Sequence, residues 1–140
     1  MTGSEDCRQI DEGQSSFVEG VEQLRLERWS CNLTMSDPRI DRTWGATINK
    51  DCQSGRCVYW GTQELHGSEG GGACSFTGRS DPTGTAEALV LLVCPGRGAN
   101  AGWTYITYNL FGPGGDFDSG GRYDGLIYKG ASPQWGPLPS

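Results

Sequence analysis

Two charged side chains lie within segments that are otherwise apolar, where a charge is well placed to do chemistry. Glu87 precedes the apolar run 88–93, and a carboxyl group desolvated there has a raised pKa and can act as a general acid or base. Arg42 alternates with apolar residues, and an inward arginine needs a carboxylate partner, for which Glu64 and Glu87 are candidates. The competing interpretation makes Glu87 the solvent-facing end of its strand. Glu87 and Arg42 are therefore the candidate catalytic residues.

A second group of candidates consists of aromatic side chains in predicted strands, joined by one carboxylate. Such residues would line a cavity and orient a ligand with their polar tips. A barrel of about eight strands is just wide enough either to be filled by its side chains or to hold one small ligand, so both interpretations stay open. The candidate ligand-binding residues are Trp44, Tyr59, Trp60, Glu64, Trp103, Tyr105 and Tyr128.

The remaining polar motifs favour no metal and no cofactor. His66 is the only histidine and shares a strand face with Glu64 beside a glycine-rich loop. It is interpreted as an exposed loop residue rather than part of a lid over a pocket. A serine-type triad has no support, because there is one histidine and no G-x-S-x-G motif. The carboxylates of the glycine-rich segment 116–124 do not have EF-hand spacing, so a hairpin loop is favoured over a calcium site.

The cysteines indicate the cellular compartment of the protein and the disulfides that cross-link its fold. An even number of cysteines in a short, glycine-rich chain predicts three disulfides and an oxidising environment. No two cysteines have C-x-x-C spacing, which disfavours zinc, and a catalytic thiol usually has a histidine base nearby. Residues 1–16 lack an apolar signal-peptide core, so the chain is interpreted as the mature form of a secreted or extracellular protein. The turns along the chain favour the pairs Cys7–Cys31, Cys52–Cys57 and Cys74–Cys94.

The elements that position these residues are predicted to be strands. The chain has 140 residues, with 23 glycines, 7 prolines and 35% hydrophobic residues, which is typical of a small all-β domain rather than a helical bundle. Alternating and β-branched runs predict strands at 17–18, 21–35, 39–49, 56–65, 73–78, 86–94, 102–111 and 122–129. Short turns between successive strands favour an antiparallel up-and-down β-barrel of about eight strands, stapled by disulfides, because closure removes sheet edges.

Domain organisation follows from the same pattern. Residues 1–16 are predicted to be a polar N-terminal arm, 17–130 the barrel domain, and 131–140 a proline-rich C-terminal tail. The net charge of −6 disfavours nucleic-acid binding, which needs a basic face. No apolar run is long enough to cross a membrane as a helix.

Short glycine-containing motifs resemble those of a known superfamily. They are Ser-Asp-Pro-Arg-Ile-Asp-Arg-Thr-Trp at 36–44, Trp-Gly-Thr at 60–62 and Gly-Arg-Gly-Ala-Asn-Ala-Gly-Trp-Thr-Tyr at 96–105. Over residues 30–130 the chain resembles small bacterial barrels of the allene oxide cyclase and dirigent-like superfamily. That resemblance implies an eight-stranded antiparallel barrel with an axial apolar cavity, a hydrophobic small molecule as ligand, no metal or organic cofactor, and homo-oligomers.

Three functions are compatible with these observations. The first is a secreted β-barrel that binds a small hydrophobic molecule in its central cavity. The second is a cofactor-free cyclase or isomerase of the same fold. The third is a structural or interaction protein with a filled barrel. A cavity smaller than a small ligand, together with a patch of tryptophans on the outer surface, would favour the third.

Overall fold

A single antiparallel sheet accounts for almost all of the regular structure. The computed structural model describes residues 2–38, 43–67, 70–80, 87–113 and 116–131, with the backbone alone described at 87–88, 112–113 and 116–120. The strands are β1 (Thr2–Asp11), β2 (Gln14–Val18), β3 (Val21–Met35), β4 (Thr43–Gln53), β5 (Arg56–His66), β6 (Gly70–Ser80), β7 (Glu87–Gly98), β8 (Trp103–Pro113) and β9 (Asp116–Lys129).

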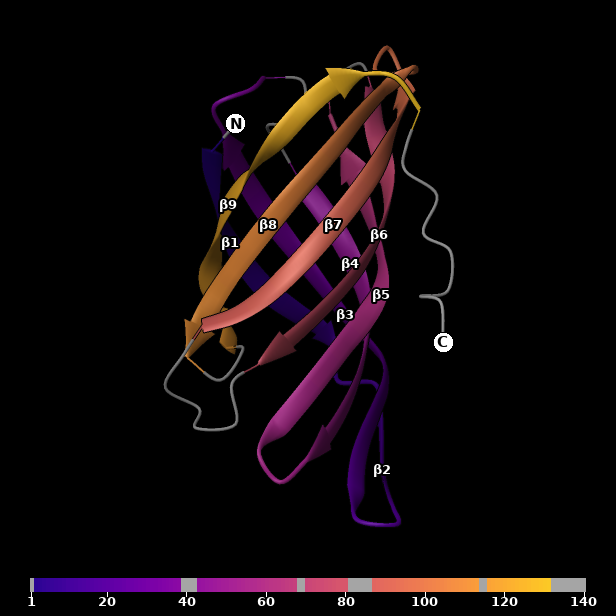
Figure 1. The fold of residues 1–140 in the computed structure, drawn as a ribbon, viewed down its shortest axis with the longest axis vertical. Helices are drawn as coiled ribbons and strands as arrows, with labels where there is room; N and C mark the ends of the chain where they lie inside the picture. Colours follow the sequence, from indigo (N-terminus) through magenta and orange to yellow (C-terminus); the bar gives the residue numbers. More distant parts are fainter. Residues whose placement is uncertain (1, 39–42, 68–69, 81–86, 114–115, 132–140) are drawn as a thin grey trace, which may run out of the picture.

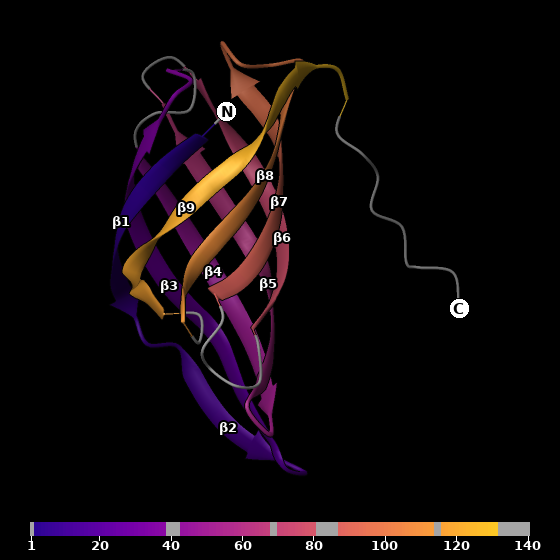
Figure 2. The ribbon, with the colours of Figure 1, turned by 60° about the vertical axis from the view of Figure 1, so that its left-hand side comes forward.

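Eight of these strands form a closed ring. Each strand from β3 to β8 pairs with its successor in the chain, and β1 closes the ring by pairing with both β3 and β9 (Figures 1 and 2). The predicted all-β, up-and-down architecture is therefore confirmed. The ninth strand, β2, pairs only with β3 and lies outside the ring, where the β2–β3 and β4–β5 hairpins project from one end (Figure 1).

Alternation along the strands separates an interior from an outer surface. In β4, Trp44, Ala46 and Ile48 are buried, whereas Thr43 is exposed. The interior is packed mainly with aromatic and aliphatic side chains, including Tyr105, which has no exposed surface. Among the described residues no helix could span a membrane.

All three predicted disulfides are present with the predicted partners. Cys7–Cys31 joins β1 to β3, Cys52–Cys57 closes the β4–β5 hairpin, and Cys74–Cys94 joins β6 to β7. In each pair the two cysteines lie directly opposite or almost opposite one another on neighbouring strands. The described residues contain no free cysteine. The three bonds are compatible with an extracellular protein.

The N-terminal segment differs from the expected polar arm. Thr2–Asp11 is strand β1, and its residue Gly3 pairs with Met35 on one side and Tyr123 on the other. Its inward residues are glycine, glutamate and cysteine rather than aliphatic residues, so the usual apolar alternation is missing from the sequence. Of the predicted C-terminal tail, residues 132–140 lie outside the described part.

Candidate functional site

The most unusual group in the interior is the carboxyl group of Glu5 on β1. Its side chain is 8% exposed and lies inside the ring. Trp44 Nε1 donates a hydrogen bond to Glu5 Oε2 at 2.7 Å, and the Tyr123 hydroxyl group donates a second one to the same oxygen at 2.6 Å. Glu5 Oε1 is buried and has no hydrogen-bond partner. One carboxyl group therefore links β1, β4 and β9 through the core.

Burial changes the acidity of both partners in this contact. Desolvation raises the pKa of Glu5 to about 7, although the hydrogen bonds from Tyr123 and Trp44 oppose the rise. Desolvation also raises the pKa of Tyr123 well above its usual value, and the neighbouring charge of Glu5 adds to the effect. The two groups therefore form a buried acid pair with perturbed pKa values, which is a common property of functional sites and also of structural networks.

A small interior cavity lies beside this pair among the described residues. The side-chain amides of Gln63 and Asn109 lie close to the Tyr123 hydroxyl group and slightly favour its ionised form. Gln63 Nε2 and Asn109 Nδ2 are nevertheless outside hydrogen-bond geometry. The interior cavity lined by Trp44, Gln63, Phe76, Asn109 and neighbouring described residues has a volume of about 10 Å³. That is room for about one water molecule.

A glycine makes room for the buried carboxyl group. A Cβ atom at Gly121 would lie 2.5 Å from Glu5 Oε1 and 2.9 Å from the Phe111 ring. Gly121→Ala is therefore expected to lower the free energy of unfolding by about 2 kcal/mol through overpacking. Urea denaturation would measure this loss, and an unchanged midpoint would show that the carboxyl group does not occupy this space.

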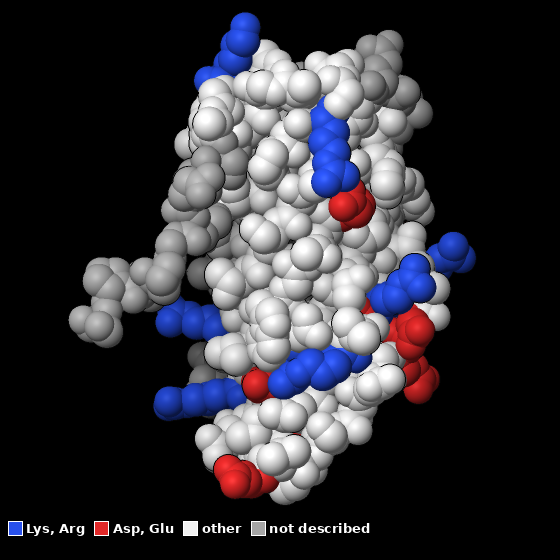
Figure 3. Space-filling view, turned by 90° about the vertical axis from the view of Figure 1, so that its right-hand side faces the viewer, with Lys and Arg blue, Asp and Glu red and all other residues white. Residues whose placement is uncertain are grey.

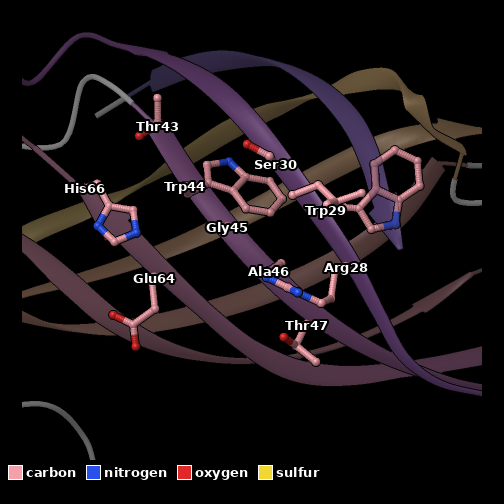
Figure 4. A pocket seen from close by; sticks show the side chains of 11 residues that line it. Arg28, Trp29, Ser30, Thr43, Trp44, Gly45, Ala46, Thr47, Glu64 and His66 are labelled. Carbon is pink, nitrogen blue, oxygen red and sulfur yellow. The ribbon is translucent and has the colours of Figure 1, made fainter. Parts of the chain in front are cut away.

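A larger hollow lies on the outer surface of the barrel, across β3, β4 and β5. It has a volume of about 340 Å³, and we call it the β3–β5 groove (Figure 4). Gly45 lies at its centre, where the absence of a side chain leaves space: a Cβ atom there would meet nothing closer than the Trp29 carbonyl oxygen at 3.8 Å. The groove is lined by outward side chains of Arg28, Ser30, Thr43, Thr47, Glu64 and His66.

The strand register brings these groups together. Ser30, Gly45 and Glu64 lie side by side on three neighbouring strands, with Arg28 opposite Thr47 and His66 opposite Thr43. Figure 4 shows Arg28 extending from β3 across β4, with Glu64 and His66 on the opposite side of Gly45. Glu64 Oε2 accepts a hydrogen bond from Arg97 at 3.1 Å. Arg28 makes no ion pair with any described residue. The groove thus offers hydroxyl groups, an imidazole, a neutralised carboxylate and a free guanidinium group.

The predicted ligand-binding residues do not converge on one site. Trp44, Tyr59 and Tyr105 are buried in the interior, and Trp103 is half-buried against the same core. Trp60 is outward, 37% exposed, with the Arg25 guanidinium group 4.9 Å from its ring. Tyr128 is also outward, and its hydroxyl group donates to the Ala131 carbonyl oxygen at 3.4 Å. Of the predicted ligand-binding residues, only Glu64 and Trp44 line the β3–β5 groove, Trp44 from its inner side.

The two predicted catalytic side chains lie outside the part of the chain that the structure describes. Arg42 lies outside the described residues, and Glu87 begins β7 with its side chain outside the described part. Glu64 pairs with Arg97, which was not among its expected partners. Segment 116–124, for which a hairpin loop was favoured over a calcium site, belongs to strand β9.

Sequence reasoning missed Glu5, Tyr123, Arg8 and Arg28. The signal for Glu5 was its position two residues before Cys7, which places both side chains on the same strand face. Glu5, Cys7 and Cys31 lie close enough to hold a metal ion, but both sulfurs are in a disulfide and offer no thiolate. This group therefore does not form a metal site.

The outer surface also carries an apolar region on the strands that follow β6. Outward residues Leu89, Tyr108 and Leu126 are exposed by 36%, 51% and 69%. On the neighbouring side, formed by β5 and β6, uncharged residues dominate, and most charged side chains lie toward the end with the projecting hairpins (Figure 3).

Comparison with known proteins finds no relative of this chain. No protein-family model, no curated protein and no solved structure matches this chain.

Proposed function

We propose that the protein is a secreted binding protein that holds a small polyhydroxylated molecule, such as a sugar, in the β3–β5 groove. The observation that supports this most directly is the contrast in space: about 340 Å³ in the groove against about 10 Å³ in the interior cavity. Ligand pockets typically start at roughly 300 Å³. The three disulfides support an extracellular location.

The chemistry of the groove suits hydroxyl groups better than an apolar ligand. Ser30, Thr43 and Thr47 can each donate and accept a hydrogen bond, and Glu64 accepts them. Alternating donors and acceptors are what a polyhydroxylated molecule needs, since each of its hydroxyl groups has both capacities. A hydrophobic molecule in the central cavity would instead require the packed interior side chains, such as Phe76, to move.

A second candidate is the cofactor-free isomerase, and one observation favours it. Glu5, whose pKa is raised to about 7, lies next to Tyr123, and such a pair can transfer protons near neutral pH. A substrate would have to enter the interior to reach it. A planar unsaturated ketone that shifted the NMR signal of the Trp44 indole N–H would support entry, and no shift at saturation would exclude this candidate.

Filling the groove tests the binding proposal. Gly45→Val is expected to fold normally, because the space beside Gly45 is open and valine suits a strand. It should abolish the amide chemical-shift changes that millimolar glucose or glucuronate produces on β3, β4 and β5 of the wild type. Thr34→Val, on an exposed position of β3 outside the groove, is the matched control and should bind like the wild type. Wild-type spectra unaffected by both sugars would refute the proposal.

A further inference from the structure

The β3–β5 groove continues onto β1, where a second hollow adjoins it. This hollow has a volume of about 260 Å³ and is lined by Asp6, Cys7, Arg8, Ser30 and Asn32. Ser30 lines both hollows. A ligand longer than one sugar ring could therefore extend from Gly45 across Ser30 toward β1.

Two arginines flank this junction. Arg8 lies directly opposite Ser30 on the neighbouring strand, and Arg28 lies two residues from Ser30 on the same face of β3. Diagonal neighbours of this kind are separated by roughly 7–8 Å. The Arg28 side chain extends toward β4 in the structure (Figure 4), so it would have to turn toward β1 for both guanidinium groups to meet above Ser30. Both side chains are exposed, and neither makes an ion pair with a described residue.

In the described part of the chain, carboxylates lie near the two arginines without pairing with them: Asp11 is opposite Arg28 on β1, and its Oδ1 accepts a hydrogen bond from the Gly13 N–H. Arg97 neutralises Glu64 at the far wall, and Asp6 is the one carboxylate that lines the second hollow. The remaining pair of guanidinium groups contrasts with the net charge of −6 of the whole chain. Guanidinium groups bind planar or tetrahedral oxyanions through two parallel hydrogen bonds.

We infer that Arg8 and Arg28 form an oxyanion subsite, so that the ligand is an acidic saccharide whose carboxylate or sulfate group lies above Ser30. This inference rests on the proposed function, because the body of the sugar would occupy the β3–β5 groove. Hydroxyl groups of the sugar then face Thr43, Thr47 and Glu64, while the oxyanion faces the two arginines.

Titration with a charged sugar and its neutral counterpart tests the subsite. Glucuronate is expected to bind the wild type at least tenfold more tightly than glucose, as measured by NMR titration at low ionic strength. Arg8→Gln and Arg28→Gln should each lower the glucuronate affinity about tenfold, and the double variant should bind glucuronate no better than glucose. Arg28→Lys keeps the charge and should retain part of the preference. Glucose 6-sulfate distinguishes a sulfate ligand from a carboxylate ligand. If glucose 6-sulfate binds more tightly than glucuronate, the ligand is a sulfated sugar.

Controls separate the failure of this inference from that of the proposed function. Arg79→Gln removes an exposed positive charge on β6, outside both hollows, and should leave every affinity unchanged. Equal affinities for glucose and glucuronate in the wild type would overturn the oxyanion subsite while the binding function stood. No change on β3, β4 and β5 with any of the three sugars would overturn both.

Discussion

Glu5→Gln is expected to make the protein more stable than the wild type at pH 8, by about 2 kcal/mol, and less stable at pH 4, by about 1 kcal/mol. The pKa of Glu5 is about 7 in the folded protein and 4.5 without burial, so the folded state binds more protons than the unfolded state between these values. The wild type therefore loses stability as the pH rises from 4.5 to 7, by about 3 kcal/mol in total, and the loss then levels off. Glutamine has no charge to bury, but its amide adds an N–H donor without a partner, which reduces the gain.

Urea denaturation at several pH values measures this effect as a difference between the two proteins, so that other titrating groups cancel. Glu12→Gln, at an exposed position, is the matched control and should follow the wild type throughout. A constant difference between the Glu5→Gln variant and the wild type from pH 4 to pH 8 would show that the Glu5 carboxyl group is not buried as the structure places it.

Removal of the Cys7–Cys31 disulfide by Cys7→Ala and Cys31→Ala is expected to cost about 3.5 kcal/mol. The bond spans 24 residues of sequence, and its loss increases the conformational entropy of the unfolded chain by an amount that grows with loop length. This bond also attaches β1, whose pairing closes the ring, so the variant should become sensitive to limited proteolysis within 2–11. Thermal and urea denaturation would measure the loss.

The Cys52–Cys57 disulfide of the β4–β5 hairpin provides a comparison with the Cys7–Cys31 disulfide. Cys52→Ala with Cys57→Ala removes a bond that spans only 5 residues, and the same relation gives about 2 kcal/mol. Proteolysis within 2–11 should not change in this variant. If both double variants lost the same stability and were cut at the same rate, β1 would not depend on its disulfide for attachment.

The sequence predicted the strands and the disulfides because both depend on local pattern. The turn residues between Cys52 and Cys57 place these two cysteines opposite each other on neighbouring strands. The alternation of apolar and polar residues in 43–49 separated inward from outward side chains. Strand β1 was missed for a physical reason: its inward residue Glu5 is polar, and the partners that satisfy it, Trp44 and Tyr123, are distant in sequence. No pattern within 1–16 carries that information.

The β3–β5 groove was harder to foresee, because a missing side chain creates it. The space at Gly45 becomes a groove because Ser30 and Glu64 lie on either side of it. This register depends on how three strands pair with one another. Glu64 and His66 were recognised as neighbours on one face, since both lie on β5. Arg28 belongs to another strand, so its position opposite them required the complete sheet.

Closure of the ring by β1 also sets the order in which the strands can pair during folding. Thr2 pairs with Asp124, so β1 gains its second neighbour only after β9, more than a hundred residues later in the chain, has been synthesised. A chain emerging from the ribosome can form the hairpins from β2 to β8 in turn, but the burial of Glu5 is completed only when β9 arrives. Folding dominated by such distant contacts takes roughly milliseconds to seconds, and until then β1 has an unpaired edge that a chaperone or another copy of the chain can bind.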